Sequence, residues 1–123
     1  MNNYWADFSS LARFGVLPQP FAAGSRIFVA DEQGDCMYLV RSGRVSITAH
    51  GTVVESVGPG GLFGEMSLID GSPRSATATA AENCELIPVD RATFLQFVRQ
   101  SPDFALHVMQ LLVSRLRQMN ESL

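Results

Sequence analysis

The chain has 123 residues, of which 46% are hydrophobic and 17% are charged. This composition is typical of one soluble globular domain with a single core, and it excludes a disordered chain. The formal net charge is −3, which disfavours broad nucleic-acid binding because such binding neutralises many phosphates. No apolar run approaches the roughly 20 residues that span a bilayer, and no basic and then apolar leader opens the sequence. We therefore expect no membrane partner and a cytoplasmic location.

A helix is predicted over about residues 2–14. Apolar side chains recur at helical spacing in NNYWADFSSLARF, and Gly15 ends the pattern. The proline- and glycine-containing segment that follows, LPQPFAAGSRIF, indicates a connection that enters a strand.

Short strands are predicted over about residues 20–89. The segments RIFV, MYLVR, RVSITAH, TVVESV, SATATAA and CELIPV are strand-sized and are separated by turn residues. Ser42-Gly43 and His50-Gly51 have the size of two-residue hairpin turns, and Pro88 is expected near a strand end or at an edge. Many closely spaced strands without long helices between them predict an antiparallel β jelly-roll barrel.

Two helices are predicted over about residues 90–122. Asp90 can cap the first helix, and Ser101 and Pro102 suit the N-cap and first position of the second, with Asp103 at the positive end of its dipole. The expected fold is therefore mainly β with flanking helices, in a single domain over residues 1–123: a jelly-roll barrel with an N-terminal helix and two C-terminal helices.

The strongest functional signal is the stretch FGEMSLIDGSPRSATATA, residues 63–80. Arg74 follows a Ser-Pro turn, and its guanidinium can hold a phosphate through two parallel hydrogen bonds. Ser75 and Ala76 leave room beside it and offer backbone N–H groups, while an ionised Glu65 is an acceptor suited to a sugar hydroxyl. The short GEMSLI segment can form a helix whose first N–H groups favour an anion. Together these features predict a sugar-phosphate site.

The same stretch resembles the phosphate-binding cassette of the cyclic nucleotide-binding domain family, in which F-G-E, a small apolar helix and a proline turn precede R-[S/T/A]-A. Upstream, GSRIFVADEQGDCMYLVRSGRVSIT is similar to the family's strand entry and following loop and hairpin. Downstream, DRATFLQFVRQSPDFALHVMQLLVSRLRQ is similar to its two trailing helices. The resemblance covers about residues 10–120 and implies a non-catalytic regulatory module of the CAP/CRP type that binds a cyclic nucleotide.

The resemblance also implies roles for single residues. Glu65 would accept from the ribose 2′-hydroxyl, Gly64 would bring its backbone to the same sugar, and Arg74 would bind the cyclic phosphate with its two neighbours. The predicted ligand-binding residues are Phe63, Gly64, Glu65, Met66, Arg74, Ser75, Ala76 and Asn120. In the family a serine or alanine after the arginine goes with cAMP and a threonine with cGMP, so cAMP is the expected ligand and cGMP the alternative.

Two details of this prediction have open alternatives. Asn120 can meet the adenine edge, or it can be a solvated side chain near the C-terminus. In residues 30–35, ADEQGD, Asp31 stands where the family usually has a glycine. Aspartate tolerates a positive φ better than most residues, so we expect this departure to affect loop geometry more than ligand contacts.

The last helix has more apolar residues than one narrow stripe can hold. Met109, Leu112, Leu116 and Met119 step by three, four and three, as in a coiled-coil seam. Together with a resemblance to bacterial members that dimerise through this helix, the seam indicates a homodimer. The alternative is that the first helix covers this face within one monomer. Bound ligand is expected to move the last helix over the base.

The same residues are compatible with functions other than nucleotide binding. Glu65 and Arg74 can simply pair with each other and brace a loop, or the chain can be an interaction domain whose pocket no longer binds nucleotide. An enzyme is disfavoured because no nucleophile and base come together around the stretch. His50 and His107 do not make the clustered histidines of a metal site, and no metal or other cofactor is expected.

The cysteines and the end of the chain add three expectations. Cys36 and Cys84 have no CxxC spacing and are expected to be reduced. Bacterial regulators with this domain usually continue into a helix-turn-helix, whereas this sequence has no recognition helix or basic cluster before Leu123. We therefore expect the output to come from an effector protein or from an output domain outside the chain.

Overall fold

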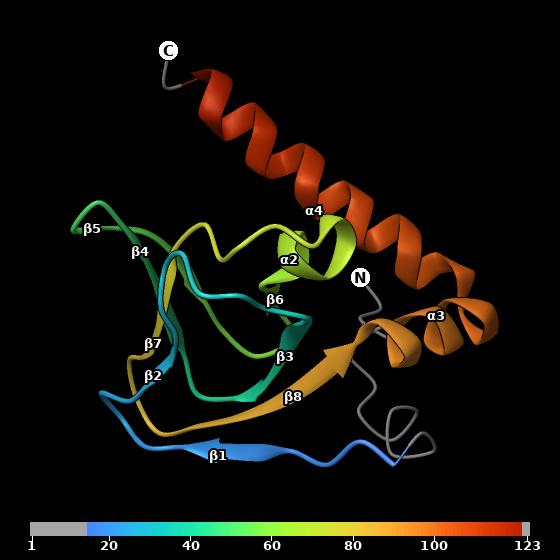
Figure 1. The fold of residues 1–123 in the computed structure, drawn as a ribbon, viewed down its shortest axis with the longest axis horizontal. Helices are drawn as coiled ribbons and strands as arrows, with labels where there is room; N and C mark the ends of the chain where they lie inside the picture. The colour runs from blue at the N-terminus through green and yellow to red at the C-terminus, as the bar shows by residue number, and fades with distance from the viewer. Residues whose placement is uncertain (1–14, 122–123) are drawn as a thin grey trace.

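The structure is a computed structural model that describes residues 15–121, with side chains described as far as Gln118. The helix predicted over residues 2–14 lies outside the described residues, and so do the side chains of Met119 and Asn120. The strands form one body, and the two helices at the C-terminal end lie beside and above it (Figure 1).

Two antiparallel sheets make up this body. One has the order β1 (Gln19–Phe21), β8 (Cys84–Asp90), β3 (Cys36–Ser42) and β6 (Leu62–Phe63). The other has the order β2 (Arg26–Phe28), β7 (Thr77–Ala80), β4 (Val45–Ala49) and β5 (Thr52–Val57). The mainly β, jelly-roll fold is confirmed. Among residues 15–121 no strand pairing joins the two sheets, so the barrel is open at both sides.

Strand β3 alternates between two cores, because successive side chains point to opposite faces of a sheet. Met37 and Leu39 are buried in a core that also takes side chains from three helices, α2 (Glu65–Asp70), α3 (Arg91–Gln100) and α4 (Pro102–Glu121). Val40 is buried in a second core between the sheets, and Tyr38 packs against it. The β1–β8–β3–β6 sheet is thus covered on both faces, which explains the unbroken apolar run MYLV.

The turns agree with the predictions in part. His50 and Gly51 have φ angles of 53° and 78°, as a two-residue hairpin between twisted strands requires, so this hairpin is confirmed. The hairpin predicted at Ser42-Gly43 is wrong, because β3 and β4 lie in different sheets. The chain turns a corner there, with Gly43 at a φ of 86°.

Pro88 lies in β8, an inner strand of its sheet. Its position is nevertheless compatible with a proline, because β1 pairs with β8 at residues 84–86 and does not reach Pro88. The second half of β8 therefore has a strand partner on one side, β3. This is the local equivalent of the edge position predicted from the sequence.

Three helices are described: α2 (Glu65–Asp70), α3 (Arg91–Gln100) and α4 (Pro102–Glu121). The Asp90 carboxylate accepts a hydrogen bond from the Thr93 N–H at 2.8 Å, so the predicted cap of α3 is confirmed. This bond lowers the pKa of Asp90. Helix α4 begins at Pro102 as predicted. Of the helices described between residues 15 and 121, none combines the length and apolar character that a membrane crossing needs.

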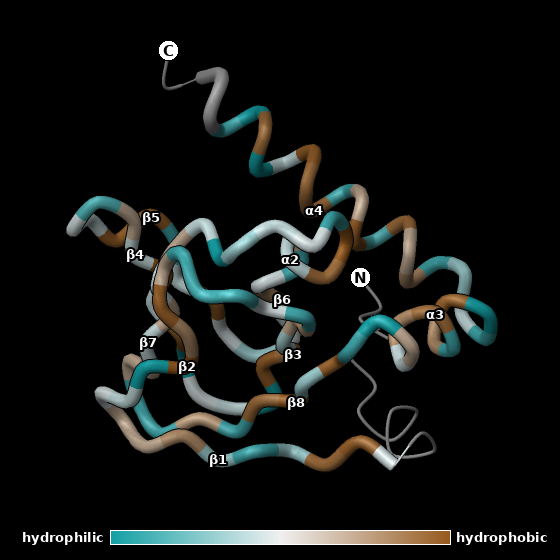
Figure 2. Tube along the Cα trace, in the orientation of Figure 1, coloured by the Kyte–Doolittle hydropathy of each residue, from teal (hydrophilic) through white to brown (hydrophobic). Residues whose placement is uncertain are grey.

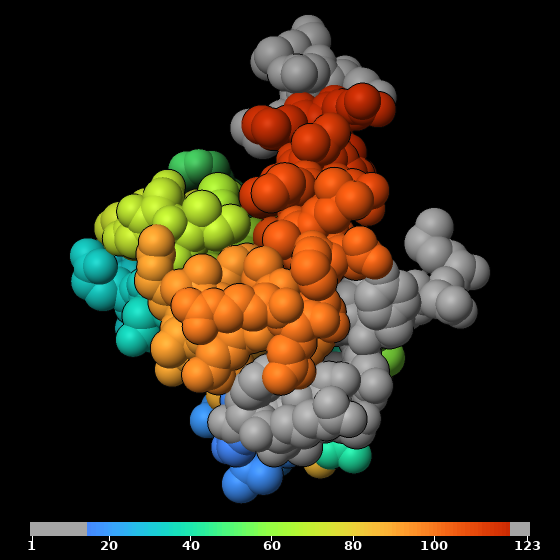
Figure 3. Space-filling view, turned by 90° about the vertical axis from the view of Figure 1, so that its right-hand side faces the viewer, coloured from blue at the N-terminus to red at the C-terminus, as the bar shows by residue number. Residues whose placement is uncertain are grey.

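Helix α4 is apolar on two sides. Its inner side buries Phe104 and Val108 in the core that it shares with the first sheet. Its outer side leaves four large hydrophobic side chains exposed at steps of three, four and three, here named the α4 stripe: Leu106, Met109, Val113 and Leu116. Figure 2 shows hydrophobic residues at intervals along this helix, and in Figure 3 its red end rises beyond the body of the molecule.

The α4 stripe differs from the predicted seam. Leu112, which the prediction placed on the outside, packs partly buried against the core, and Met119 lies outside the described side chains. Periodicity alone fits both seams, since each steps by three and four. The seam that is exposed depends on which face of α4 packs on the sheet, and periodicity does not show that face.

Candidate functional site

The segment between β6 and β7 is a short helix held between two glycines. Gly64 precedes α2 at a φ of 80° and Gly71 follows it at 74°, a conformation that glycine adopts without strain. The Asp70 carboxylate accepts from the Ser72 N–H at 2.9 Å and the Ser72 hydroxyl at 2.6 Å, which lowers the pKa of Asp70. After this turn the chain returns to the start of α2, so that Arg74 lies beside Gly64. A Cβ added to Gly64 would lie only 2.8 Å from Arg74 Nη1.

A cavity of about 420 Å³ opens beside this segment, here named the Arg74 cavity. Seven of the eight residues predicted to bind ligand line it: Phe63, Gly64, Glu65, Met66, Arg74, Ser75 and Ala76. Asn120 is the exception, and its side chain lies outside the described residues. The lining also includes residues that the sequence did not single out: Phe28, Ile47, Ala49, Val54, Glu55, Ser67 and Arg115.

Arg74 is buried in the wall of the Arg74 cavity. The residue is 5% exposed. Its Nη1 donates to the Gly64 carbonyl at 3.0 Å and its Nη2 to the Cys36 carbonyl at 2.7 Å. Its Nε has no hydrogen-bond partner, and no carboxylate pairs with it in the part of the chain that the structure describes. A buried, unpaired charge is costly, so the cavity is electrostatically suited to an anion.

Glu65 pairs with α4 and not with Arg74. Its carboxylate is 2% exposed and forms an ion pair with Arg115 Nη1. The Arg115 Nη2 also donates to Glu55 Oε2 at 3.0 Å and to the Leu62 carbonyl at 3.2 Å. The alternative in which Glu65 and Arg74 merely brace each other does not fit this arrangement. Instead, the acid of the predicted site is tied to the last helix.

Arg115 was missed by the sequence reasoning, although a signal was present. The inner side of α4 is set by Val108 and Leu111, and position 115 follows these by seven and four residues. Residues at this spacing share a helix face. An arginine on a face that otherwise packs against the body points to a buried acidic partner.

The lining of the Arg74 cavity is otherwise mostly uncharged. Burial, followed by the hydrogen bond with Cys36, raises the pKa of the nearby Tyr38 to about 12, so this phenol is neutral at physiological pH. Apolar side chains supply much of the wall: Phe28, Ile47, Ala49, Val54 and Phe63. A cavity with an unpaired cation, a buried carboxylate and apolar walls can hold an anion, a hydroxyl and a flat ring together.

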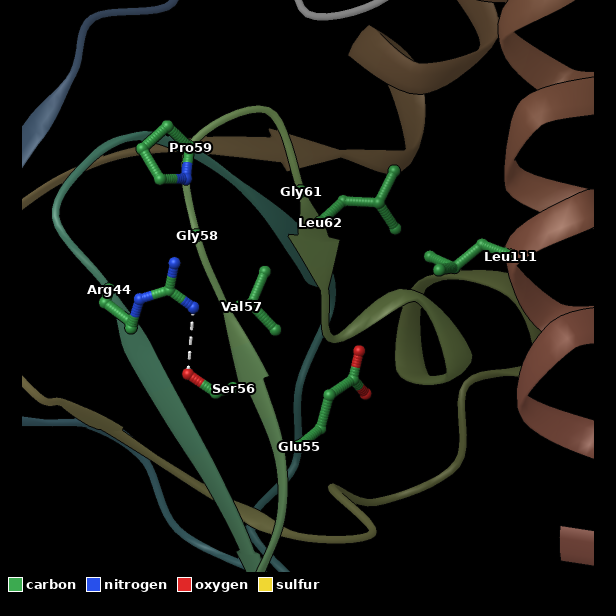
Figure 4. Close-up of a pocket in the computed structure, with 9 residues that line it drawn as sticks. All are labelled: Arg44, Glu55, Ser56, Val57, Gly58, Pro59, Gly61, Leu62 and Leu111. Atoms are coloured by element: carbon green, nitrogen blue, oxygen red, sulfur yellow. Dashed lines mark hydrogen bonds between the residues drawn. The ribbon is translucent and has the colours of Figure 1, made fainter. Parts of the chain in front are cut away.

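A second cavity of about 390 Å³, here named the Arg44 cavity, lies on β5 and the loop that follows it (Figure 4). Its two charged residues already have partners, since Arg44 Nη1 donates to the Ser56 hydroxyl at 3.0 Å and Glu55 pairs with Arg115. Arg44 is also exposed. The Arg44 cavity therefore lacks the buried, unpaired charge that distinguishes the Arg74 cavity. Within residues 15–121 no cluster of His, Cys, Asp and Glu side chains could hold a metal ion.

Known proteins resemble this chain over most of its length. The family model "Cyclic nucleotide-binding domain" matches residues 18–101. The cyclic AMP receptor protein of Thermus thermophilus is 38% identical over 103 residues, which are 80% of this chain and 48% of that protein. A cAMP-dependent protein kinase regulatory subunit of Yarrowia lipolytica is 42% identical over 72 residues, 58% of this chain and 19% of that protein.

Solved structures agree with the sequence matches. The crystal structure of Thermus thermophilus catabolite activator protein superposes with a TM-score of 0.83 and 34% identity. The match covers 96% of this chain and 57% of that one. The chain thus spans about half the length, or less, of the curated relatives described above.

Proposed function

The chain belongs to the cyclic nucleotide-binding domain family, and from this premise we propose that it is a regulatory sensor whose ligand is cyclic AMP. The observation that carries the proposal is the buried guanidinium of Arg74, which faces a cavity of about 420 Å³ and has no counter-ion among the described residues. The cyclic phosphate supplies that missing negative charge. Its oxygens accept from the N–H groups of Arg74 that the two carbonyls leave free.

The remaining lining fits the rest of the nucleotide. Glu65 is an acceptor for the ribose 2′-hydroxyl, with Gly64 close to the same sugar. The Ser75 hydroxyl and the Ser75 and Ala76 backbone are further donors to the phosphate. The serine after Arg74, and the cyclic AMP in the names of the two curated relatives, favour cyclic AMP over cyclic GMP.

Arg115 gives this site a route to the last helix. Because Arg115 holds Glu65, a ribose hydroxyl that bonds to the Glu65 carboxylate changes the ion pair that fixes α4 over the cavity. A ligand shifts a conformational equilibrium by its difference in affinity for the two states. Movement of α4 is therefore the proposed signal. Residues 102–118 should exchange amide hydrogens at a different rate when cyclic AMP is bound, and unchanged rates would contradict this mechanism.

Ligand binding is tested most directly by thermal unfolding. A ligand that binds only the folded state stabilises it by about 2.7 kcal/mol at 100 times its dissociation constant. For a domain of this size we expect a rise in Tm on the order of 10 °C. Calorimetry with cyclic AMP, cyclic GMP and linear 5′-AMP compares preference and ring dependence in one assay. If neither cyclic nucleotide raises Tm at millimolar concentration, the interaction-domain alternative replaces the sensor.

The α4 stripe supports a second element of the proposal, a homodimer. Its four exposed hydrophobic side chains repeat at coiled-coil spacing, and such a stripe is complementary to a second copy of itself. We expect Met109→Glu to convert a dimer to a monomer in sedimentation equilibrium, while Gln110→Glu, at the neighbouring exposed position, leaves the dimer intact. A wild-type protein that sediments as a monomer would contradict the homodimer.

The output of the signal is proposed to lie elsewhere. The two relatives are, by name, a receptor protein and a kinase regulatory subunit, and this chain spans half or less of their length. We assign the chain no catalytic step and place the output in an effector protein or in an output domain outside these 123 residues. A cytoplasmic location is consistent with Cys36 and Cys84, which are both free thiols.

A further inference from the structure

The Arg74 side chain is held by a segment far from it in the sequence, residues 28–36. We propose that this segment, here named the arginine seat, fixes the Arg74 guanidinium before any ligand arrives, and that Phe28 and Gly34 are positioning residues for phosphate binding. The second half of this inference rests on the proposed function. Neither residue was among those predicted to form the site.

The seat first holds the Arg74 backbone. The Asp31 N–H donates to the Arg74 carbonyl at 2.8 Å, and the Arg74 N–H donates to the Glu32 carbonyl at 2.8 Å. The loop itself is closed, since the Glu32 carboxylate accepts from the Val29 N–H at 2.7 Å. The Ala30 N–H donates to the Thr77 hydroxyl at 3.0 Å, which ties the loop to β7. Both backbone groups of Arg74, its N–H and its carbonyl, are thus hydrogen-bonded to this loop.

Asp31 completes this backbone arrangement. It stands where the family usually has glycine, and its φ is 74°, a conformation that aspartate tolerates better than most residues. The expectation that this departure affects loop geometry more than ligand contacts stays a prediction. Because the Asp31 N–H bonds to the Arg74 carbonyl, the geometry of the loop also sets the position of the ligand-binding arginine.

The seat next holds the Arg74 side chain. The Cys36 carbonyl accepts from Nη2 at 2.7 Å, and the guanidinium carbon lies 4.1 Å from the centre of the Phe28 ring. A Cβ on Gly34 would lie 2.2 Å from Arg74 Nε and 2.4 Å from its Cζ. The guanidinium therefore packs directly on the Gly34 backbone, in a space that any side chain at position 34 would fill.

The Phe28 ring is itself fixed. Its centre lies 5.8 Å from that of Phe63 and 6.2 Å from that of Tyr38. An aromatic face beside a guanidinium contributes about 0.5–2 kcal/mol, most when the pair is shielded from water. Because Arg74 is 5% exposed, the shielded case applies. Phe28 thus supplies attraction to a cation that no carboxylate of the described residues pairs with.

Fixing the guanidinium in advance raises affinity. A free arginine side chain samples many rotamers, and a ligand that must order such a side chain binds more weakly. In the seat this ordering occurs when the protein folds. The cavity then presents a pre-oriented fork of N–H groups to the phosphate.

The first test needs no ligand. The Hε–Nε cross-peak of Arg74 in the NMR spectrum is assigned by its loss in Arg74→Lys. We expect its heteronuclear NOE to be close to that of the backbone. Arg41, whose side chain is 48% exposed, is the internal control and should give a low value. Phe28→Leu and Gly34→Ala should lower the Arg74 value. An Arg74 NOE as low as that of Arg41 in the wild-type protein would overturn the seat, whether or not the protein binds a nucleotide.

The second test separates positioning from general stability. Phe28→Leu should weaken cyclic AMP binding measurably and by up to about 30-fold, the factor that corresponds to the aromatic contribution in the shielded case, and Phe28→Tyr should restore it. Gly34→Ala should weaken binding at least as much, since its φ is not positive and the nearest atoms to the new Cβ all belong to Arg74. Adenosine, which lacks the phosphate, should bind all these variants like wild type.

The outcomes are distinguishable. Equal losses of affinity for adenosine and for cyclic AMP would show a general structural effect and would overturn the positioning function. Wild-type affinity for cyclic AMP in both Phe28→Leu and Gly34→Ala would overturn it as well. Failure of the wild-type protein to bind any cyclic nucleotide would instead contradict the proposed function. In that case the NMR measurement on the ligand-free protein still decides whether the seat exists.

Discussion

Replacing Arg74 by alanine is expected to lower the affinity for cyclic AMP by about 30- to several-thousand-fold. Truncating one partner of a buried, hydrogen-bonded charge pair costs about 2–5 kcal/mol, and each 1.4 kcal/mol is about tenfold in affinity. The free protein should lose far less stability than the complex. The guanidinium is buried with no counter-ion within the described part of the chain, so its removal relieves an unfavourable burial of charge. Isothermal titration calorimetry and ligand-free thermal unfolding measure the two effects separately.

Two further variants sharpen this experiment. Arg74→Lys retains the charge without the planar fork, so its affinity should lie between those of wild type and Arg74→Ala. Arg41→Ala is the matched control, because Arg41 is an arginine of β3 with a half-exposed side chain; it should bind cyclic AMP like wild type. An Arg74→Ala protein that binds cyclic AMP within threefold of wild type (about 0.6 kcal/mol) would show that the phosphate lies elsewhere.

Local sequence signals predicted the parts of the site that are contiguous in the chain. The stretch from Phe63 to Ala76 contains its own glycines, helix and turn, so its shape depends on residues within about one helical turn of each other. Seven of the eight predicted residues accordingly line one cavity. The cap at Asp90 and the hairpin at His50-Gly51 are local in the same sense.

Long-range packing decided the features that the sequence did not predict. The turn at Ser42-Gly43 looks like a hairpin, but β3 does not pair with the next strand; its partners are β6 and β8, and β8 lies about 45 residues further on. Turn chemistry contains no information about that partner. Likewise, Glu65 and Arg74 are neighbours in sequence, yet each has its main partners in other elements: Arg115 of α4 for the acid, and Phe28 and Cys36 for the base.

Replacing Arg115 by methionine is expected to destabilise the protein by about 3–5 kcal/mol. Removing one partner of a buried ion pair leaves the other charge uncompensated, and Glu65 is 2% exposed. The same change frees Glu55 and the Leu62 carbonyl, which Arg115 Nη2 holds at 3.0 and 3.2 Å. Total stability of such a domain is about 5–15 kcal/mol, so chemical denaturation should show a large fall in the midpoint.

The double variant Glu65→Gln with Arg115→Met shows whether this loss comes from the stranded carboxylate. Replacing both charges removes the unpaired ion, and replacing a buried ion pair by uncharged groups is often close to neutral. We therefore expect the double variant to be more stable than Arg115→Met alone. Arg115→Lys should keep most of the stability, since it retains a cation near Glu65. A midpoint for Arg115→Met equal to that of wild type would contradict the ion pair. The proposed coupling between the ribose site and α4 would then lose its physical basis, because no other bond between a charged group of α4 and Glu65 is found in the described residues.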